Sequence, residues 1–331
     1  MDQNEVSRGS AGSPGVRRTL FLGGAFVLLL GIVRPVSLDP RLESGPEEDR
    51  FYIRKAHVVE PCEIVFLGDS RVLRGVSPSA VAQVAVGARI SNFAWNSGSL
   101  NPEMYREVER RLESASPARA VVCGVTAMAL LAWKATNEQY RENLEKPKDE
   151  VFAKLRFTPA LRFFRPLTPT TVVSSLLGWP PDWTYEQEFY DDGWIASDRV
   201  PRDISVAPTL YAETLAGHQV SHEFVEGFLA QTREWTSRGI HVFAFSPPRH
   251  AGTREVEVRL TGFDEADLAR RFEQAGGTWI DFDDEAYETY DGSHLTRESA
   301  IAFSRDLGAA LREDLGGLLA EASAPPPAAV P

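Results

Sequence analysis

The sequence lacks the clustered basic residues of a nucleic-acid-binding protein. Its 331 residues carry 47 acidic side chains against 35 Lys and Arg, which gives a net charge of −12 and a pI near 5.1. Because phosphate binding needs clustered Lys and Arg, no nucleic-acid partner is expected. The chain also lacks a glycine-rich loop of the kind that cradles phosphates.

Cysteine is scarce, with only Cys62 and Cys123 in the chain. Cys62 precedes the first expected strand and Cys123 lies near the end of another. In parallel strands that rise ~3.3 Å per residue, the two would be about 20 Å apart, which is too far for a disulfide. Two unpaired, structural thiols are therefore expected.

A complete set of metal ligands is also lacking. His218 and His222 lie four residues apart on an expected helix, but no third ligand is near in the sequence. The acidic run at 281–285 lacks the glycine and the ligand periodicity of a calcium loop. The sequence predicts neither a metal nor a cofactor.

Residues 19–33 form an uncharged, apolar run that follows Arg17 and Arg18. As a helix this run spans about 22 Å, and residues up to Leu38 extend it toward the ~30 Å of a bilayer core. We expect a cytoplasmic leader at 1–18 and an uncleaved transmembrane signal anchor at 19–38, with the rest of the chain periplasmic or extracellular. A cleaved signal peptide, which would release a soluble secreted protein, and a buried core helix are the alternatives.

The remainder divides into a linker at 39–58, an α/β domain at 59–320 and a proline- and alanine-rich tail at 321–331. Within the domain, apolar runs alternate with helical patterns, which predicts a parallel sheet covered by helices on both faces. The expected strands are residues 64–67, 88–93, 118–123, 240–245 and 278–282. An irregular insertion at 134–217, rich in aromatic residues and proline, is either a lid over a site or decoration.

The most informative stretch is Gly68-Asp69-Ser70, directly after the apolar run at 64–67. A serine at the end of a buried strand and the start of a helix is well placed for a nucleophile. Its candidate partners are His294 as general base and Asp291 as the group that orients the imidazole. Their turn should lie at the same carboxyl edge of the sheet as Ser70. The alternative is a pair of ordinary turns that cap helices.

Gly-Asp-Ser after the first strand, a glycine-containing turn after the second and Asp-x-x-His before the last helix resemble the SGNH (GDSL-type) hydrolases. The resemblance covers residues 60–133 and 220–320, and it is greatest to membrane-anchored members related to alginate O-acetyltransferases and D-alanine transfer proteins. It implies a three-layer α/β/α fold with a parallel, flavodoxin-like sheet. It also implies Ser70 as nucleophile, His294 as base and Asp291 as its partner. No glycine follows two residues after Ser70, so the pattern differs from the α/β-hydrolase elbow.

The chain departs from this family at the oxyanion site. Gly124-Val125-Thr126 occupies the place of the usual Gly-x-Asn, and losing one donor typically slows such an enzyme ~100- to 1,000-fold. The Thr126 hydroxyl or the Asn96 side chain could substitute. The backbone N–H groups of Ser70 and of Gly98 or Ser97 are expected to supply the other donors.

These features predict a serine esterase or O-acyltransferase that acts on acyl esters, such as those of a surface polysaccharide, through an acyl-enzyme on Ser70. The expected partners are the ester substrate and a membrane, through the N-terminal helix. Hydrolysis and transfer use the same intermediate, so the sequence leaves both open. The alternative from another class is a catalytically silent SGNH-like domain that binds glycan or serves as a scaffold.

Overall fold

Five parallel strands form the central sheet of the protein, in the order β2-β1-β3-β6-β7. The computed structural model describes residues 45–98, 100–164 and 184–322. The strands are β1 (Ile64–Leu67), β2 (Ile90–Asn92), β3 (Ala120–Gly124), β6 (His241–Phe245) and β7 (Thr278–Ile280). Each falls within or beside one of the apolar runs identified in the sequence, so the prediction of an α/β fold with a parallel sheet is confirmed.

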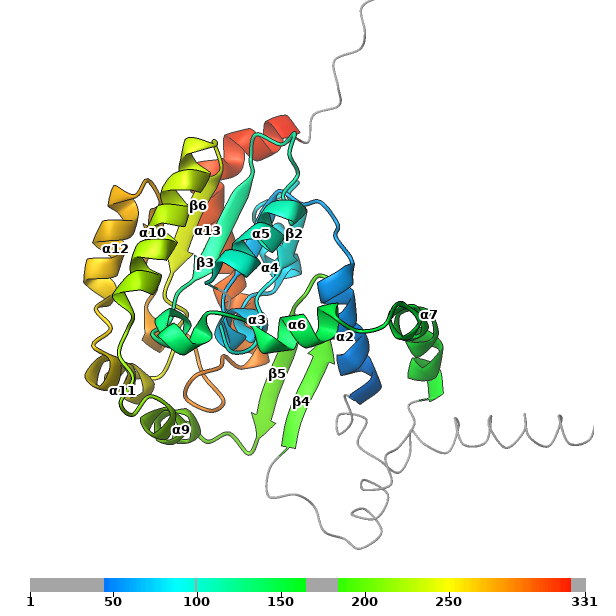
Figure 1. Ribbon diagram of the computed structural model, residues 1–331, viewed down its shortest axis with the longest axis horizontal. Coiled ribbons are helices and arrows are strands. Elements are labelled where there is room, and N and C mark those ends of the chain that lie inside the picture. Colours follow the sequence, from blue (N-terminus) through cyan, green and yellow to red (C-terminus); the bar gives the residue numbers. More distant parts are fainter. Residues whose placement is uncertain (1–44, 99, 165–183, 323–331) are drawn as a thin grey trace, which may run out of the picture.

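Helices cover both faces of this sheet (Figure 1). On one face, α5 packs against α10 through Tyr105 and Trp235, and α10 contacts α12. On the other face, α13 packs on α3 and α4. The covering helices are α3 (Ser70–Gly75), α4 (Pro78–Ala82), α5 (Pro102–Arg111), α10 (His222–Ser237), α12 (Glu265–Gln274) and α13 (Arg297–Ala322). Helix α11 (Ala251–Thr261) instead contacts α9 (Val206–Thr214) beyond the strand ends (Figure 1).

Much of the expected linker is a helix. Residues Gly45–His57 form α2, in which Phe51, Tyr52 and Ile53 are buried. Tyr52 stacks on Trp95 with ring centroids 5.6 Å apart, so α2 belongs to the core of the domain. The prediction of a linker is therefore wrong for this segment. The charged residues at 47–50 made the sequence look like a linker, although apolar residues follow them.

The expected signal anchor at 19–38 and the tail from residue 323 lie outside the described residues. Among the helices of the described ranges, none combines the length and the apolar character needed to cross a bilayer.

The insertion contains more regular structure than the sequence suggested. It includes α6 (Glu138–Leu144), α7 (Lys148–Phe164) and α9 (Val206–Thr214). Strands β4 (Thr184–Phe189) and β5 (Ile195–Val200) form an antiparallel hairpin, in which Phe189 pairs with Ile195. The expectation of an irregular segment is wrong for these residues, and residues 165–183 lie outside the described part.

Strands β1 and β3 end at the same level of the sheet, because Leu67 pairs with Cys123. The first turn of α3 packs directly over these two ends. A Cβ atom on Gly68 would lie 2.3 Å from Val72 Cγ2, and one on Gly124 would lie 2.1 Å from the same atom. Glycine at both strand ends therefore lets α3 sit against the sheet, which fixes the height of Ser70 above it.

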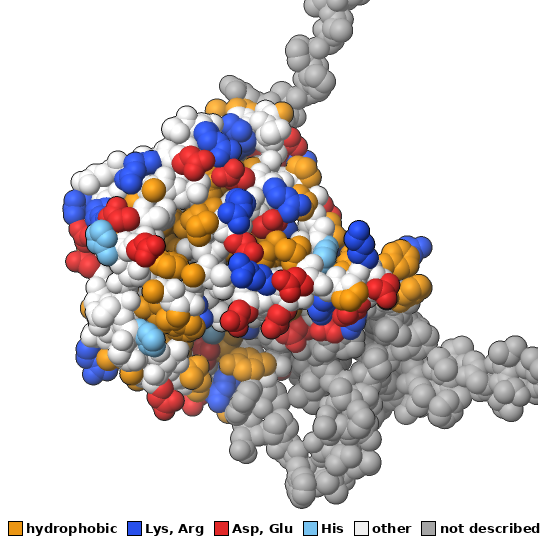
Figure 2. Space-filling view, in the orientation of Figure 1, with side chains coloured by type: hydrophobic (Ala, Val, Ile, Leu, Met, Phe, Trp, Pro, Cys, Tyr) orange, Lys and Arg blue, Asp and Glu red, His pale blue; other side chains and the backbone are white. Residues whose placement is uncertain are grey.

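Charge is mixed over the surface that Figure 2 displays. Lys and Arg side chains are interspersed there with Asp and Glu, and apolar side chains lie between them. Many of the basic groups are paired, such as Arg141 with Glu103 and Arg238 with Glu109.

Candidate active site

Ser70 lies at the carboxyl edge of the sheet, at the first residue of α3. The turn is set by Asp69, the N-cap of α3, whose Oδ1 accepts a hydrogen bond from the Arg71 amide at 2.9 Å. Ser70 itself is only partly buried. The chain passes from β1 outward to β2 and then returns to β3 on the other side of β1. Such a reversal opens a crevice at the carboxyl ends of the strands, where ligands of α/β proteins bind.

His294 and Asp291 approach Ser70 from the turn that precedes α13. His294 Nε2 lies 2.9 Å from Ser70 Oγ, and His294 Nδ1 lies 2.7 Å from Asp291 Oδ2. With the Nδ1 proton donated to the carboxylate, Nε2 is free to accept the proton of the serine hydroxyl. The structure thus brings the three residues together in the order of a serine, base and acid relay.

Asp291 is held as a carboxylate. Burial alone would raise its pKa, but His294 counters this effect through its charge and its ring N–H, and the amides of His294 and Ser293 donate to the same group. The net effect lowers the pKa to about 2. Asp291 therefore stays ionised at neutral pH and can stabilise an imidazolium on His294.

The turn that carries this pair is fixed by neighbouring elements. Gly292 has φ +92°, and a Cβ atom there would lie 2.3 Å from the Ile204 carbonyl oxygen. The Gly292 carbonyl oxygen accepts hydrogen bonds from the His250 amide and from Thr253 Oγ1, at the start of α11. The turn can approach α9 and α11 this closely only with glycine at position 292.

Tyr290 supports the imidazole from one side. Its ring stacks on that of His294 with centroids 5.7 Å apart and an angle of 16° between the planes. Its hydroxyl shares a hydrogen bond with Ser197 Oγ at 3.2 Å, which connects the site to β5. Burial raises the pKa of Tyr290 well above its usual value, so the phenol is neutral.

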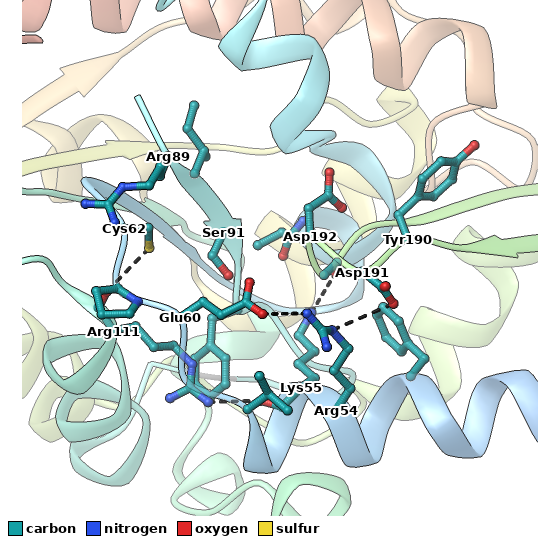
Figure 3. Close-up of a pocket in the computed structure, with 17 residues that line it drawn as sticks. Arg54, Lys55, Glu60, Cys62, Arg89, Ser91, Arg111, Tyr190, Asp191 and Asp192 are labelled. Atoms are coloured by element: carbon teal, nitrogen blue, oxygen red, sulfur yellow. Dashed lines mark hydrogen bonds and ion pairs between the residues drawn. The ribbon is translucent and has the colours of Figure 1, made fainter. Parts of the chain in front are cut away.

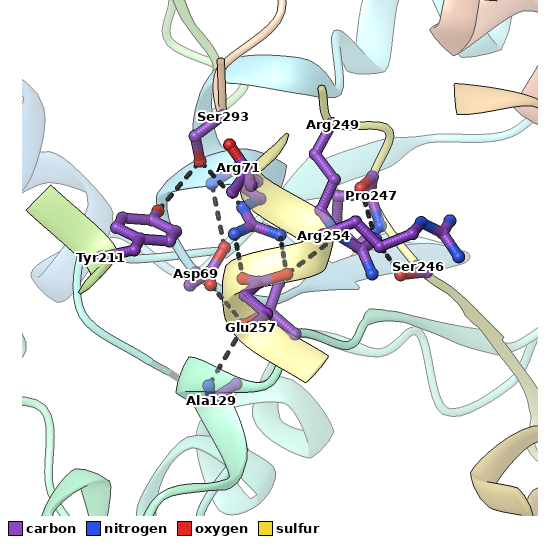
Figure 4. Close-up of polar contacts among 12 residues, drawn as sticks. Asp69, Arg71, Ala129, Tyr211, Ser246, Pro247, Arg249, Arg254, Glu257 and Ser293 are labelled. Carbon is purple, nitrogen blue, oxygen red and sulfur yellow. Dashed lines mark hydrogen bonds and ion pairs between the residues drawn. The ribbon is translucent and has the colours of Figure 1, made fainter. Parts of the chain in front are cut away.

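Arg71, the residue after Ser70, forms a buried network beneath the site (Figure 4). Its Nε donates to Ser293 Oγ at 2.9 Å, and its guanidinium pairs with Glu257 of α11. Arg249 Nε also lies 2.8 Å from Glu257, while Arg249 Nη2 reaches Glu265 at 3.0 Å. Burial would lower the pKa of Arg71, but Glu257 raises it above its ordinary value. The network joins α3 and α11 to the His294 turn.

The backbone amides expected to bind an oxyanion have no hydrogen-bond acceptor among the described residues. These amides are the N–H groups of Ser70, Ser97 and Gly98. Asn137 Nδ2 donates to the carbonyl oxygens of Asn96 at 2.8 Å and Gly98 at 2.7 Å. Because N–H and C=O point in opposite directions across a trans peptide, the bond to the Asn96 carbonyl turns the Ser97 N–H away from Asn137.

The prediction that the Thr126 hydroxyl could serve as an oxyanion donor is wrong. Thr126 Oγ1 donates its single proton to Asp69 Oδ2 at 2.6 Å and accepts from the Ala129 amide. Asn96 differs, because only one contact of its Nδ2 group is formed, to the Tyr52 hydroxyl at 2.9 Å. One amide proton of Asn96 is therefore still free for a ligand, as far as the described residues go.

Sequence reasoning assigned no role to Arg71, Glu257 or Asn137. Arg71 and Glu257 are 186 residues apart, and no periodicity connects them. Asn137 precedes α6 and caps it through the Tyr140 amide, so its sequence pattern indicates only a helix start. Its two hydrogen bonds to the carbonyl oxygens of Asn96 and Gly98 can be recognised only in the folded structure.

A pocket of about 400 Å³ beside the edge strand β2 does not include Ser70, His294 or Asp291 (Figure 3). Its charged side chains satisfy one another, since Arg54 pairs with Glu60 and with Asp191. Lys55 Nζ donates to the Gly193 carbonyl oxygen at 2.8 Å. Because these charged groups already have partners within the protein, the pocket offers few of them to a ligand.

The two cysteines are buried and free. Burial, with a smaller contribution from Glu63, raises the pKa of Cys62 to about 12, so this thiol is not a nucleophile near neutral pH. In the described ranges, no group of three or more His, Cys, Asp or Glu side chains is arranged to hold a metal ion. His222 instead lies 3.6 Å from Glu226 on the surface of α10.

Compared with protein families, curated proteins and solved structures, the chain matches none of them. The geometry around Ser70 therefore has to support the functional conclusion by itself.

Proposed function

We propose that this protein is a serine esterase or O-acyltransferase of the SGNH type, with Ser70, His294 and Asp291 as its catalytic residues. The observation that carries the proposal is the continuous hydrogen-bonded relay from Ser70 Oγ to His294 and on to Asp291, with distances of 2.9 and 2.7 Å. The strand order also supports it, because it corresponds to that of flavodoxin-like doubly wound sheets.

The reaction follows from these positions. Ser70 Oγ attacks the acyl carbon as its proton passes to His294 Nε2, and the carbonyl oxygen becomes an oxyanion near the amides of Ser70, Ser97 and Gly98. Collapse of this intermediate expels the alcohol, which takes the proton from His294. His294 then removes a proton from water or from an acceptor hydroxyl, whose oxygen attacks the acyl-serine and releases the acid or the new ester.

The substrate and location remain those expected from the sequence. We propose an O-acylated surface polysaccharide or similar ester as substrate, handled outside the cytoplasm by a protein anchored through residues 19–38. N-terminal sequencing of the mature protein tests the anchor, because a cleaved signal peptide would remove these residues.

Labelling with a serine-directed fluorophosphonate tests the chemistry. Wild-type protein should be labelled, and Ser70→Ala should not, while Ser79→Ala on exposed surface near α3 serves as a matched control. Equal labelling of folded Ser70→Ala and wild type would contradict the proposal.

A catalytically silent binding or scaffold protein is the second candidate. It is favoured by Thr126, whose hydroxyl is bound to Asp69 where the family has an asparagine that donates to the oxyanion. Turnover of p-nitrophenyl acetate that His294→Ala abolishes would exclude it.

A further inference from the structure

Two basic side chains contact the turn at residues 96–98. Arg74 Nη1 donates to Asn96 Oδ1 at 3.0 Å. The stem of Lys134 packs on Gly98, since a Cβ atom there would lie 3.4 to 3.5 Å from its Cβ, Cγ and Cδ atoms. Arg74 and Lys134 thus both contact the turn that carries the candidate oxyanion amides.

Both side chains are also close to the catalytic residues. Arg74 lies one helical turn after Ser70 on α3, and residues four apart on a helix share a face. Asp291 is among the groups that raise the pKa of Arg74 against the effect of burial, together with Tyr290, Tyr52 and Tyr185. Burial lowers the pKa of Lys134, and Asp69 partly opposes this, so Lys134 lies within the field of the residue before Ser70.

Neither side chain has an acidic partner in the part of the chain that the structure describes. This contrasts with Arg71 and Arg249, which share Glu257. Lys134 is only 7% exposed, and its Nζ makes no hydrogen bond to a described residue. A largely buried side chain such as Lys134, whose ammonium forms no ion pair with a described residue, gains a partner when an anion binds.

The surroundings of Lys134 suit an organic anion. Its Nζ lies 3.6 Å from the centre of the Trp133 ring, and Trp133 is 46% exposed. A partly exposed aromatic ring with a cation over one face offers apolar contact to a sugar ring and charge to its acidic substituent. Arg74 adds a planar guanidinium, which matches carboxylate and phosphate geometry and has used one of its five N–H groups on Asn96.

We propose that Arg74 and Lys134 bind a carboxylate or phosphate group of the substrate, so that the ester presented to Ser70 belongs to an anionic molecule. Naming this molecule a substrate rests on the proposed function. The anion site itself does not require chemistry at Ser70, so the two proposals can fail separately.

Binding is measured first, by calorimetric titration of the full chain carrying Ser70→Ala. The probes are glucuronate, glucose 6-phosphate and glucose, which separate a carboxylate from a phosphate and both from a neutral sugar. At least one anion should bind about tenfold or more tightly than glucose, and Arg74→Gln and Lys134→Met should each reduce its affinity about tenfold. Arg74→Lys and Lys134→Arg should retain more of it.

Exposed cations provide matched controls. Arg106→Gln on α5 and Lys148→Met on α7 remove the same charges elsewhere and should leave anion affinity unchanged. Thermal unfolding of every variant identifies any loss of fold. Equal binding of glucose and the anions, absence of binding, or anion binding unaffected in folded Arg74→Gln and Lys134→Met would each overturn the proposal.

Kinetics then connect the site to the reaction. Monoacetylated methyl glucuronoside and methyl glucoside are compared as substrates of the wild type and of the two variants. Both variants should lose about tenfold in kcat/KM for the acid and little for the neutral sugar. An equal loss for both esters would mean that the cations act on the reacting carbonyl, which overturns substrate recognition. Intact anion binding without turnover by the wild type would instead refute the proposed function and leave the anion site standing.

Discussion

Arg71 Nε donates a hydrogen bond to Ser293 Oγ at 2.9 Å, so the residue after the candidate nucleophile is bonded to the residue before the candidate base. The residues next to these two, Ser70 and His294, are joined by a hydrogen bond of the same length. Two adjacent hydrogen bonds therefore join α3 to the turn before α13. The bond between Arg71 and Ser293 holds the two segments together and so helps to fix the distance over which the proton moves from Ser70 to His294.

Ser293→Ala removes this acceptor and should loosen the position of His294. We expect a lower kcat with little change in KM, because a displacement of about 1 Å can cost 100-fold in rate. The free energy of unfolding should fall by about 1–3 kcal/mol, since a buried charged donor loses its partner. Steady-state kinetics and urea denaturation measure both. Ser237→Ala, on an exposed serine of α10, is the control, and wild-type kcat in Ser293→Ala would show that the bond does not position the base.

Asp291→Asn tests the role of the carboxylate in setting the tautomer of His294. Asparagine keeps an acceptor for the Ser293 and His294 amides but presents an N–H donor or a neutral oxygen to Nδ1. The imidazole should then carry its proton on Nε2, and kcat should fall by about 1,000- to 10,000-fold. Ester hydrolysis and a thermal melt are the measurements. A folded variant with a loss of less than tenfold would argue that Asp291 is not the orienting group.

The lowered pKa of Asp291 predicts a specific response to acid. A carboxylate with a folded pKa of about 2 contributes stability that is fully present above its unfolded pKa of ~4 and is lost as the pH falls toward 2. The contribution amounts to about 2–3 kcal/mol. Urea denaturation of the wild type and Asp291→Asn should therefore differ most at pH 5 to 7 and progressively less at pH 4 and pH 3. A difference that grows toward acid pH would contradict this account.

Glu257 should matter more for stability than Arg71, although they form one ion pair. Glu257→Leu leaves two buried guanidinium groups, those of Arg71 and Arg249, without this carboxylate, whereas Arg71→Met leaves Glu257 paired with Arg249. Removing one partner of a buried pair costs about 3–5 kcal/mol, so Glu257→Leu should reach or exceed that range and Arg71→Met should fall below it. Urea denaturation of the two variants measures which one loses more free energy of unfolding. Glu255→Gln, exposed on the same helix, should change stability by less than about 0.5 kcal/mol.

The central sheet could be predicted from the sequence because its strands are short, apolar and followed by turn residues. The run at 64–67 is fully buried between two other strands, which requires side chains that are apolar on both faces. Helix N-caps could also be predicted from the sequence. Asn101 is an example, because its Oδ1 accepts hydrogen bonds from the Glu103 and Met104 amides at the start of α5. Such strands and caps are determined by residues that are close to one another in the sequence, so they can be predicted from the sequence alone.

The elements that escaped prediction depend on contacts between distant residues. Strand β4 is largely polar, with Glu186, Gln187 and Glu188 in succession, and it forms because it pairs with β5 across a turn in which Gly193 has φ +94°. Helix α2 forms on the aromatic side chains of Trp95 and Phe189. For the site, the motif residues were identifiable, but the cations that flank the 96–98 turn were not, since an unpaired side chain is recognised only when its neighbours are known.

The Ser70 and His294 segments come from opposite ends of the domain, 224 residues apart. During synthesis, the turn after β1 emerges from the ribosome long before the turn that precedes α13. The relay can therefore assemble only after nearly the whole domain has been translated and its last turn has docked against α9 and α11. A nascent or truncated chain that ends before residue 291 would lack both His294 and Asp291, so any activity of this protein would report that its folding is complete.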